Sequence, residues 1–159
     1  MDVSSRHHLR SDAVRDIEEA LAAGFGMEVS AEGAERVEFA DSDWSVVLVD
    51  GEPVVTYFEG EPAPTVRGAN AHPPTKRVVT VDAGAVSFVS DGADVMRPGI
   101  VEADESIEPG DLVVIAEETH AKVLAVGRSR VAGSDLLGDS GKVIDSLHHV
   151  GDELFGFTA

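Results

Sequence analysis

Cysteine is absent from this chain of 159 residues, and aromatic residues make up only 5% of it. Without cysteine there are no disulfide bonds, no thiolate nucleophiles and no cysteine-ligated zinc sites. No window approaches the run of about 18 apolar residues that a membrane-spanning helix needs. The polar N-terminus also lacks the apolar core of a signal peptide. These absences predict a soluble, cytoplasmic protein that does not contact a membrane.

Basic residues are also scarce. Twelve Lys and Arg residues face thirty Asp and Glu residues, which gives a formal net charge of −18, and only three of the twelve are lysine. In an ordinary cytoplasm such a charge repels nucleic acid and strains the folded state. At molar salt the Debye length shrinks to about 3 Å, so this repulsion is screened. We interpret the composition as an adaptation to a salt-rich, haloarchaeal cytoplasm. The alternative is an acidic protein that binds basic partners.

The first half of the chain predicts one helix and a hairpin. Residues 11–23 carry Val14, Ile17 and Leu21 on one helical face, and Gly24 is expected to end the helix. Strand-like runs follow at residues 36–39, 44–49 and 53–58, and Asp-Gly between the last two indicates a tight hairpin. Residues 59–70 are expected to form a loop with at most one helical turn.

The second half predicts a small barrel. Short apolar runs bounded by glycine, proline or acidic turns recur at 78–82, 100–103, 111–116, 122–127 and 142–147. The His-Pro-Pro sequence at 72–74 indicates a domain junction. The predicted class is therefore α+β, with an N-terminal α+β domain at 1–72, a linker at 73–77 and a β-rich pseudo-barrel at 78–159.

Residues 84–100 form the most distinctive stretch. It contains Gly84-Ala85-Val86, then Gly92-Ala93-Asp94, then Pro98-Gly99, at turns that flank a short helix. Three turn elements in this order resemble the signature of the PUA domain, an RNA-binding module. The resemblance implies a compact pseudo-barrel that binds RNA and uses no cofactor.

The C-terminal sequence narrows the resemblance. The run from Leu147 to Phe155 resembles archaeal and eukaryotic translation-associated proteins in which a small domain precedes the PUA domain, such as the malignant-T-cell-amplified-sequence protein and ligatin. The resemblance implies binding to structured RNA, a tRNA acceptor end or ribosomal RNA, and not to DNA. It also implies the small ribosomal subunit or a translation-factor protein as a partner. Two alternatives stay open: a stand-alone partner of a transglycosylase or pseudouridine synthase, and a protein-interaction module without RNA binding.

Neither catalysis nor metal binding is indicated. The chain has no phosphate-binding loop, no Gly-x-Ser-x-Gly and no His-Glu-x-x-His motif. His7 and His8 are expected in a mobile N-terminus. Neighbouring residues of a strand point to opposite faces, so His148 and His149 are not expected to hold one ion. One of them is expected to pack or form hydrogen bonds, and the other to face solvent and contact RNA.

The candidate RNA-binding residues fall into groups. The small side chains at 84–86 and 92–94 let RNA approach the backbone, although tight turns alone also explain both glycines. Arg97 is expected to contact phosphate or to stack on a base. The alternative for Arg97 is a surface ion pair with Asp94 or Glu102. The apolar residues of this stretch are expected in the core: Val86, Phe88, Val89 and Val95. The full set of candidates is Arg77, Gly84, Ala85, Val86, Gly92, Ala93, Asp94, Arg97, Pro98, Gly99, Arg128, Arg130, Lys142, His148 and His149.

Overall fold

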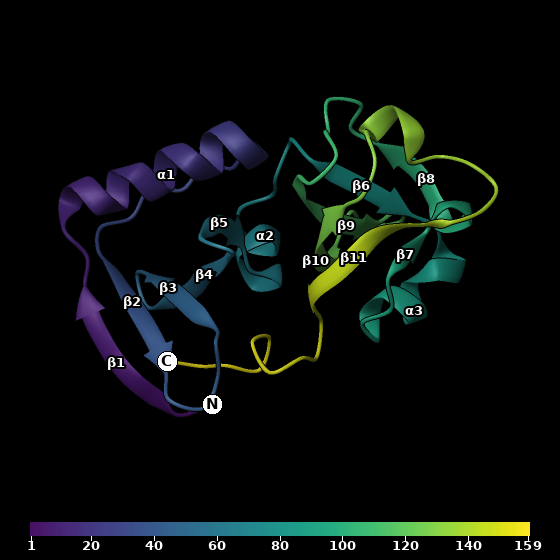
Figure 1. The fold of residues 1–159 in the computed structure, drawn as a ribbon. Coiled ribbons are helices and arrows are strands. Elements are labelled where there is room, and N and C mark those ends of the chain that lie inside the picture. The colour runs from purple at the N-terminus through teal and green to yellow at the C-terminus, as the bar shows by residue number, and fades with distance from the viewer.

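The computed structural model describes residues 1–159 and contains two sheets that lie side by side (Figure 1). The first sheet is antiparallel, and its strands follow chain order: β1 (Val3–His8), β2 (Ala34–Phe39), β3 (Ser45–Val49), β4 (Glu52–Phe58) and β5 (Glu61–Pro64). Helix α1 (Ser11–Phe25) covers this sheet, and the short helix α2 (Val66–Ala71) leads out of it towards the second sheet.

The second sheet is a curled half-barrel. Its strands are β6 (Val78–Val81), β7 (Val95–Met96), β8 (Ile100–Ala103), β9 (Leu112–Glu117), β10 (Val123–Ser129) and β11 (Lys142–His149). They lie in the order β7-β11-β10-β9-β6-β8, and only β6 and β9 are parallel. The predicted α+β class with a β-rich second half is confirmed. No helix in the structure has the length and apolar character needed to cross a bilayer.

Helix α1 ends two residues later than predicted. Its last buried side chain is Phe25, and Gly26 then adopts a left-handed conformation with φ 61° and donates its N–H to carbonyls of the last turn. This positive φ favours glycine, whereas Gly24 remains helical. A Cβ at Gly24 would make only an ordinary contact, 3.6 Å from Arg77 Nη1, so neither packing nor backbone conformation requires glycine there.

Two segments predicted to be irregular are strands. Residues around His7 and His8 form β1, which pairs with β2, so the prediction of a mobile N-terminus is wrong. Between residues 59 and 70 the chain turns at Glu59 and Gly60, both with positive φ, and returns as β5. It then enters α2, where the Thr65 hydroxyl accepts a hydrogen bond from the Gly68 N–H and caps the helix. The loop predicted there is therefore wrong because of β5, whereas the helical turn that the prediction included corresponds to α2.

One hydrophobic core runs through both halves of the molecule. Side chains of the first sheet, such as Val47 and Val55, belong to the same buried cluster as Val114 and Val126 of the second. A separate cluster fills the half-barrel. Because these interiors are close-packed, the two halves are held in a fixed relation.

The C-terminal segment returns to the first sheet, below which both termini lie (Figure 1). Leu154 is 1% exposed and packs in a cluster with Val37 and Leu48. The Phe157 ring meets Phe39 edge to face, with centroids 5.0 Å apart. The predicted division at 72–78 stays a prediction, but these residues of the predicted second domain complete the core of the first.

Asp152 secures the start of this segment. Burial disfavours its ionised form, but hydrogen bonds from the His148 ring and from the N–H groups of His149 and Phe155 outweigh burial and lower the pKa of Asp152. Because the folded-state pKa is depressed, the stabilisation is complete above the unfolded pKa of about 3.9 and is lost as pH falls through the folded value.

Replacing this carboxylate will remove part of the acid sensitivity of the fold. We expect Asp152→Asn to be less stable than wild type at neutral pH, and the difference to shrink as the pH falls below about 3.9, where first the unfolded chain and then the folded protein take up a proton at this carboxylate. Urea unfolding at a series of pH values from neutral to acidic measures the stability difference and its decrease with pH. Asp139→Asn, at an exposed site, is the matched control. A stability difference that does not change with pH would contradict the assignment.

Candidate RNA-binding groove

A groove of about 300 Å³ lies on the half-barrel between two turns of the chain. One wall is the 3-10 helix η1 (Ala83–Ala85) with α3 (Val86–Ser90), and the other is β7 with the 3-10 helix η2 (Arg97–Gly99). The Asp82 carboxylate begins η1 by accepting the Ala85 N–H at 3.0 Å. The groove is lined by Asp82, Gly84, Ala85, Phe88, Val89, Asp94, Val95, Met96, Pro98 and Gly99.

The three glycines of this region serve different purposes. Gly92 has a φ of 92°, and a Cβ there would lie 2.6 Å from His149 Nε2, so turn geometry and packing both require glycine. Gly99 lies so close to Ala85 that a Cβ would approach the Ala85 Cβ to 2.9 Å. Gly84 has ordinary φ, and a Cβ there would meet only Asp82 Oδ1, at 3.4 Å. Nothing inside the protein requires a glycine at Gly84.

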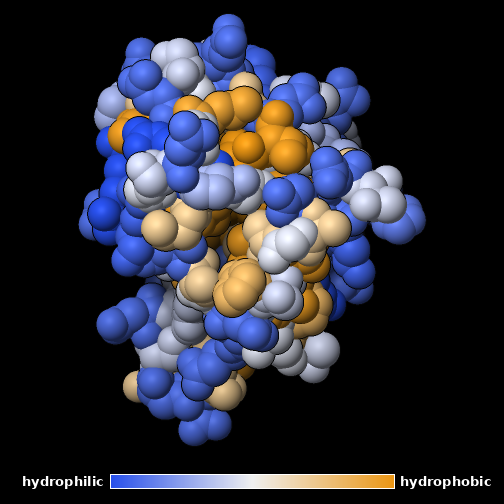
Figure 2. Space-filling model, turned by 90° about the vertical axis from the view of Figure 1, so that its right-hand side faces the viewer, coloured by the Kyte–Doolittle hydropathy of each residue, from blue (hydrophilic) through white to orange (hydrophobic).

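Apolar side chains stand open at the groove. Phe88 is 66% exposed and Met96 is 48% exposed. In Figure 2, which views the second-domain end of the molecule, hydrophobic side chains gather around a hollow within a hydrophilic surround. The prediction that Phe88 belongs to the core is wrong, because α3 has five residues and buries Val89 instead. Val89 and Val95 are buried as predicted, and Val86 is half-buried.

Arg97 lies outside the groove lining and holds the neighbouring loop. Its Nε donates to the Asp135 carbonyl at 2.9 Å, and its Nη1 donates to the Ser140 carbonyl at 3.0 Å. Its side chain also lies against Gly138 and Gly141, where any Cβ would come within 2.9 Å. The ion pairs considered with Asp94 and Glu102 are not formed. Arg97 therefore fixes the loop that follows the 3-10 helix η3 (Gly133–Asp135).

Two other predicted cations pair with acids beside the groove. Lys142 Nζ lies 3.1 Å from Asp94 Oδ2, and Arg130 forms an ion pair with Asp145. The Ser146 N–H donates to Asp94 Oδ1 at 2.8 Å. This backbone hydrogen bond, helped by Lys142, lowers the pKa of Asp94. These exposed groups compensate one another and create no positive field.

Arg77 and Arg128 lie where the half-barrel meets the first half of the chain. The Arg77 guanidinium stands over the Phe25 ring, 5.5 Å from its centroid, and Nη2 lies 3.5 Å from Asp111 Oδ1. Arg128 donates to the Gly110 carbonyl at 2.7 Å and to Glu61 at 3.1 Å. Arg77, Arg128, Arg130 and Lys142 are therefore each paired with an acid, and none of them is left free to form a basic surface.

The two adjacent histidines are both held by the protein. His148 is fully buried, its Nε2 accepts the Val66 N–H at 3.0 Å, and its Nδ1 lies 2.8 Å from Asp152. The prediction that one histidine packs is confirmed. His149 is half-buried against Gly92, with Nδ1 3.0 Å from the Ser90 carbonyl, so it does not simply face solvent. Nowhere do three or more metal-ligating side chains converge.

The groove therefore offers apolar contact and backbone groups rather than charge. Its two acids, Asp82 and Asp94, accept hydrogen bonds from the protein itself. An exposed phenyl ring beside small residues suits a flat, partly apolar group such as a nucleobase, which also finds hydrogen-bond partners on the backbone.

Comparison with known proteins agrees with this geometry. The family model of the PUA domain matches residues 77–150. An uncharacterized protein of Methanocaldococcus jannaschii is 35% identical over 161 residues, which cover 99% of each chain. The chain belongs to the family of PUA-domain proteins, and this supports an RNA-binding role.

Other relatives include a protein named for the translation machinery. Translation machinery-associated protein 20 of Saccharomyces cerevisiae is 33% identical over 119 residues, or 69% of this chain and 65% of the yeast protein. The structure of a conserved PUA-domain protein from Thermoplasma acidophilum has a TM-score of 0.83 and 29% identity, and the match covers 95% of this chain and 97% of that one. The resemblance to translation-associated PUA proteins is confirmed. Such relatives are consistent with a binding rather than a catalytic role. The haloarchaeal interpretation stays a prediction.

Sequence reasoning missed the apolar residues of the groove, above all Phe88 and Met96. The run Val86-Ser87-Phe88-Val89 alternates neither as a strand nor over a full helical repeat. A single helical turn between two glycines can bury only one of the neighbouring side chains Phe88 and Val89. This restriction was the one signal in the sequence that either of them is exposed.

Alanine substitutions at Gly92 and Gly84 test whether each position requires glycine. We expect Gly92→Ala to lose about 1–3 kcal/mol of stability, because alanine at φ 92° is strained and its methyl group displaces His149. Gly84→Ala should melt within a degree or two of wild type, as only ordinary contacts await its methyl group. Thermal unfolding of both variants checks this. Equal losses would contradict the distinction.

Proposed function

We propose that the chain is a non-enzymatic RNA-binding protein of translation, which holds a tRNA acceptor end or a ribosomal RNA element in the groove beside Phe88. The observation that carries the proposal is this phenylalanine, 66% exposed at the edge of a groove of about 300 Å³. Base stacking on such a ring contributes about 1–3 kcal/mol in proteins that bind single strands. Gly84, Ala85, Pro98 and Gly99 are the proposed backbone contacts, because they line the same groove.

The charge distribution favours an RNA end with unstacked bases over a duplex. Phosphate binding requires cations free to replace counterions. Near the groove Lys142 and Arg130 are engaged with acids, and Arg97 is engaged with carbonyls. Little affinity then comes from phosphate, and stacking with backbone hydrogen bonds must supply the rest. These are the means by which single-stranded RNA ends are recognised.

Removal of the phenyl ring tests the groove. We expect Phe88→Ala to weaken RNA binding by about 1–3 kcal/mol, roughly five- to 150-fold in Kd, because a base loses its stacking partner. Stability should change little, since the side chain is exposed. Fluorescence anisotropy with a labelled acceptor-stem hairpin ending in CCA measures the affinity.

Leu137→Ala is the matched control for Phe88→Ala. Leu137 is 50% exposed on the same domain but does not line the groove. It should bind the hairpin as wild type does. If Phe88→Ala binds equally well, the RNA site lies elsewhere on the chain.

Sedimentation tests whether the protein associates with the small ribosomal subunit. If the protein works in translation, it should co-migrate with small ribosomal subunits in a sucrose gradient of a lysate prepared at native salt. Phe88→Ala should shift towards the top of the gradient. Co-migration with an RNA-modification enzyme, and none with small subunits, would favour the alternative role in RNA modification.

A further inference from the structure

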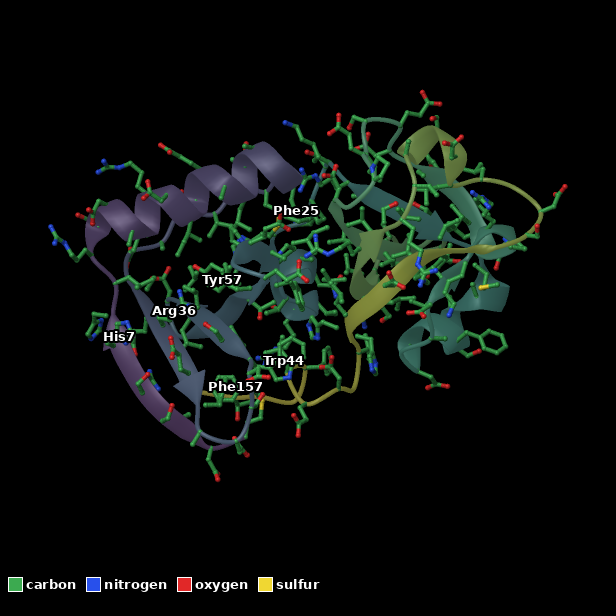
Figure 3. All side chains as sticks on the ribbon, in the orientation of Figure 1. His7, Phe25, Arg36, Trp44, Tyr57 and Phe157 are labelled. Carbon is green, nitrogen blue, oxygen red and sulfur yellow. The ribbon has the colours of Figure 1, made fainter.

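A larger hollow lies at the junction of the two domains, away from the RNA groove. This pocket, of about 530 Å³, is termed the junction pocket and is lined by Ser42, Asp43, Trp44, Tyr57, Phe58, Glu59, Arg128 and Leu147. It shares no residue with the groove. In Figure 3 Trp44 lies between the first sheet and the chain that follows β11, while Tyr57 and Arg36 lie next to each other on the sheet.

The aromatic walls of the junction pocket are held in place. The Trp44 ring meets Phe58 edge to face, with centroids 5.9 Å apart, and meets the buried His148 ring at the same distance. The backbone N–H of Trp44 donates to Ser42 Oγ at 3.1 Å. Burial raises the pKa of Tyr57, so this wall stays uncharged at neutral pH. The pocket is therefore preformed.

The protein itself already places a guanidinium on one of these walls. The Arg36 guanidinium carbon lies 4.5 Å from the centroid of the Tyr57 ring. Arginine is the cation most often found over aromatic rings, because its flat, weakly hydrated group stacks while it keeps its charge. The same kind of surface is presented to solvent within the pocket by Trp44 and Phe58.

The charged residues at the junction pocket determine whether it attracts a positively or a negatively charged group. Arg128 is the only cation in the lining, and its donors are engaged by Glu59, Glu61 and the Gly110 carbonyl. Against this one guanidinium stand the two carboxylates of the lining, Asp43 and Glu59, and a third, Glu61, which lies outside the lining and pairs with Arg128. Glu59 and Glu61 keep 86% and 58% of their side-chain surface exposed. Phosphate is repelled here, and a cation is attracted.

We propose that the junction pocket binds an arginine side chain of a partner protein. The guanidinium packs against the pocket-facing surfaces of Trp44 and Phe58, and its N–H groups donate to Asp43 and Glu59. Lysine fits less well, because its compact ammonium neither stacks nor makes paired contacts to a carboxylate. The proposal does not depend on RNA binding at Phe88, since the two sites share no residue.

Trp44 is the only tryptophan of the chain, so its fluorescence reports on this pocket alone. Titration of the full-length protein with acetyl-Gly-Arg-Gly-amide should give a saturable change in emission. The citrulline analogue, which has the same shape without the charge, should bind at least about tenfold more weakly. Equal binding of the two peptides would overturn the proposal.

Two pairs of charge-neutralising substitutions identify the site. Asp43→Asn with Glu59→Gln should weaken the arginine peptide about tenfold and leave the emission of the free protein unchanged. Asp16→Asn with Glu19→Gln removes the same charge from the exposed side of α1 and should leave peptide affinity unchanged. Equal weakening by both pairs would mean that only the overall negative field attracts the peptide, and would overturn the proposal.

Two competing occupants are tested with the same signal. Oligoadenylate should leave the Trp44 emission unchanged, and a saturable response to it would instead make the pocket a nucleobase site. Dilution of the protein without peptide should also leave the emission unchanged. A concentration-dependent change, matched by a change in sedimentation, would instead assign the pocket to a second copy of the chain.

Discussion

The buried imidazole of His148 connects three parts of the molecule on which the rest of the structure depends. It accepts a hydrogen bond from the first turn of α2, it contacts the Asp152 carboxylate that begins the C-terminal segment, and its ring packs against Trp44. A buried polar group with unmet partners costs stability, so this ring and its partners must stay in register. The position of the first sheet against the half-barrel follows from these contacts and from the shared core.

A shortage of cations shapes the surface. The cations of the second domain considered for RNA binding contact acids or carbonyls. With a net charge of −18, the protein lacks a basic surface with which to draw in nucleic acid from a distance. Recognition then depends on shape and on exposed aromatic rings. Phe88, which is exposed at the groove, and Trp44, which is partly buried in the junction pocket, provide such rings at two separate sites.

Much of the fold was predictable, because the strands of the half-barrel are short apolar runs separated by glycine and proline turns. Strand β1 could not be predicted, because all six of its residues are exposed and its sequence shows no alternation of apolar and polar residues. Strand β5 contains two prolines and was predicted as a loop. It lies at the edge of its sheet, where missing N–H donors are tolerated. The resemblance located the groove, but the exposure of Phe88 depends on which residue of a single helical turn faces inwards.

The return of the C-terminal segment has a consequence for biosynthesis. The cluster that joins Leu154 to β2 and β3 unites the last residues of the chain with some of the first. A ribosome releases the chain from its N-terminus, and domains usually fold in that order. Here the half-barrel has all of its strands before Leu154 is made, whereas the first sheet must keep one side of its core open until Leu154 has been added. The sheet that is made first is therefore the one that is completed last.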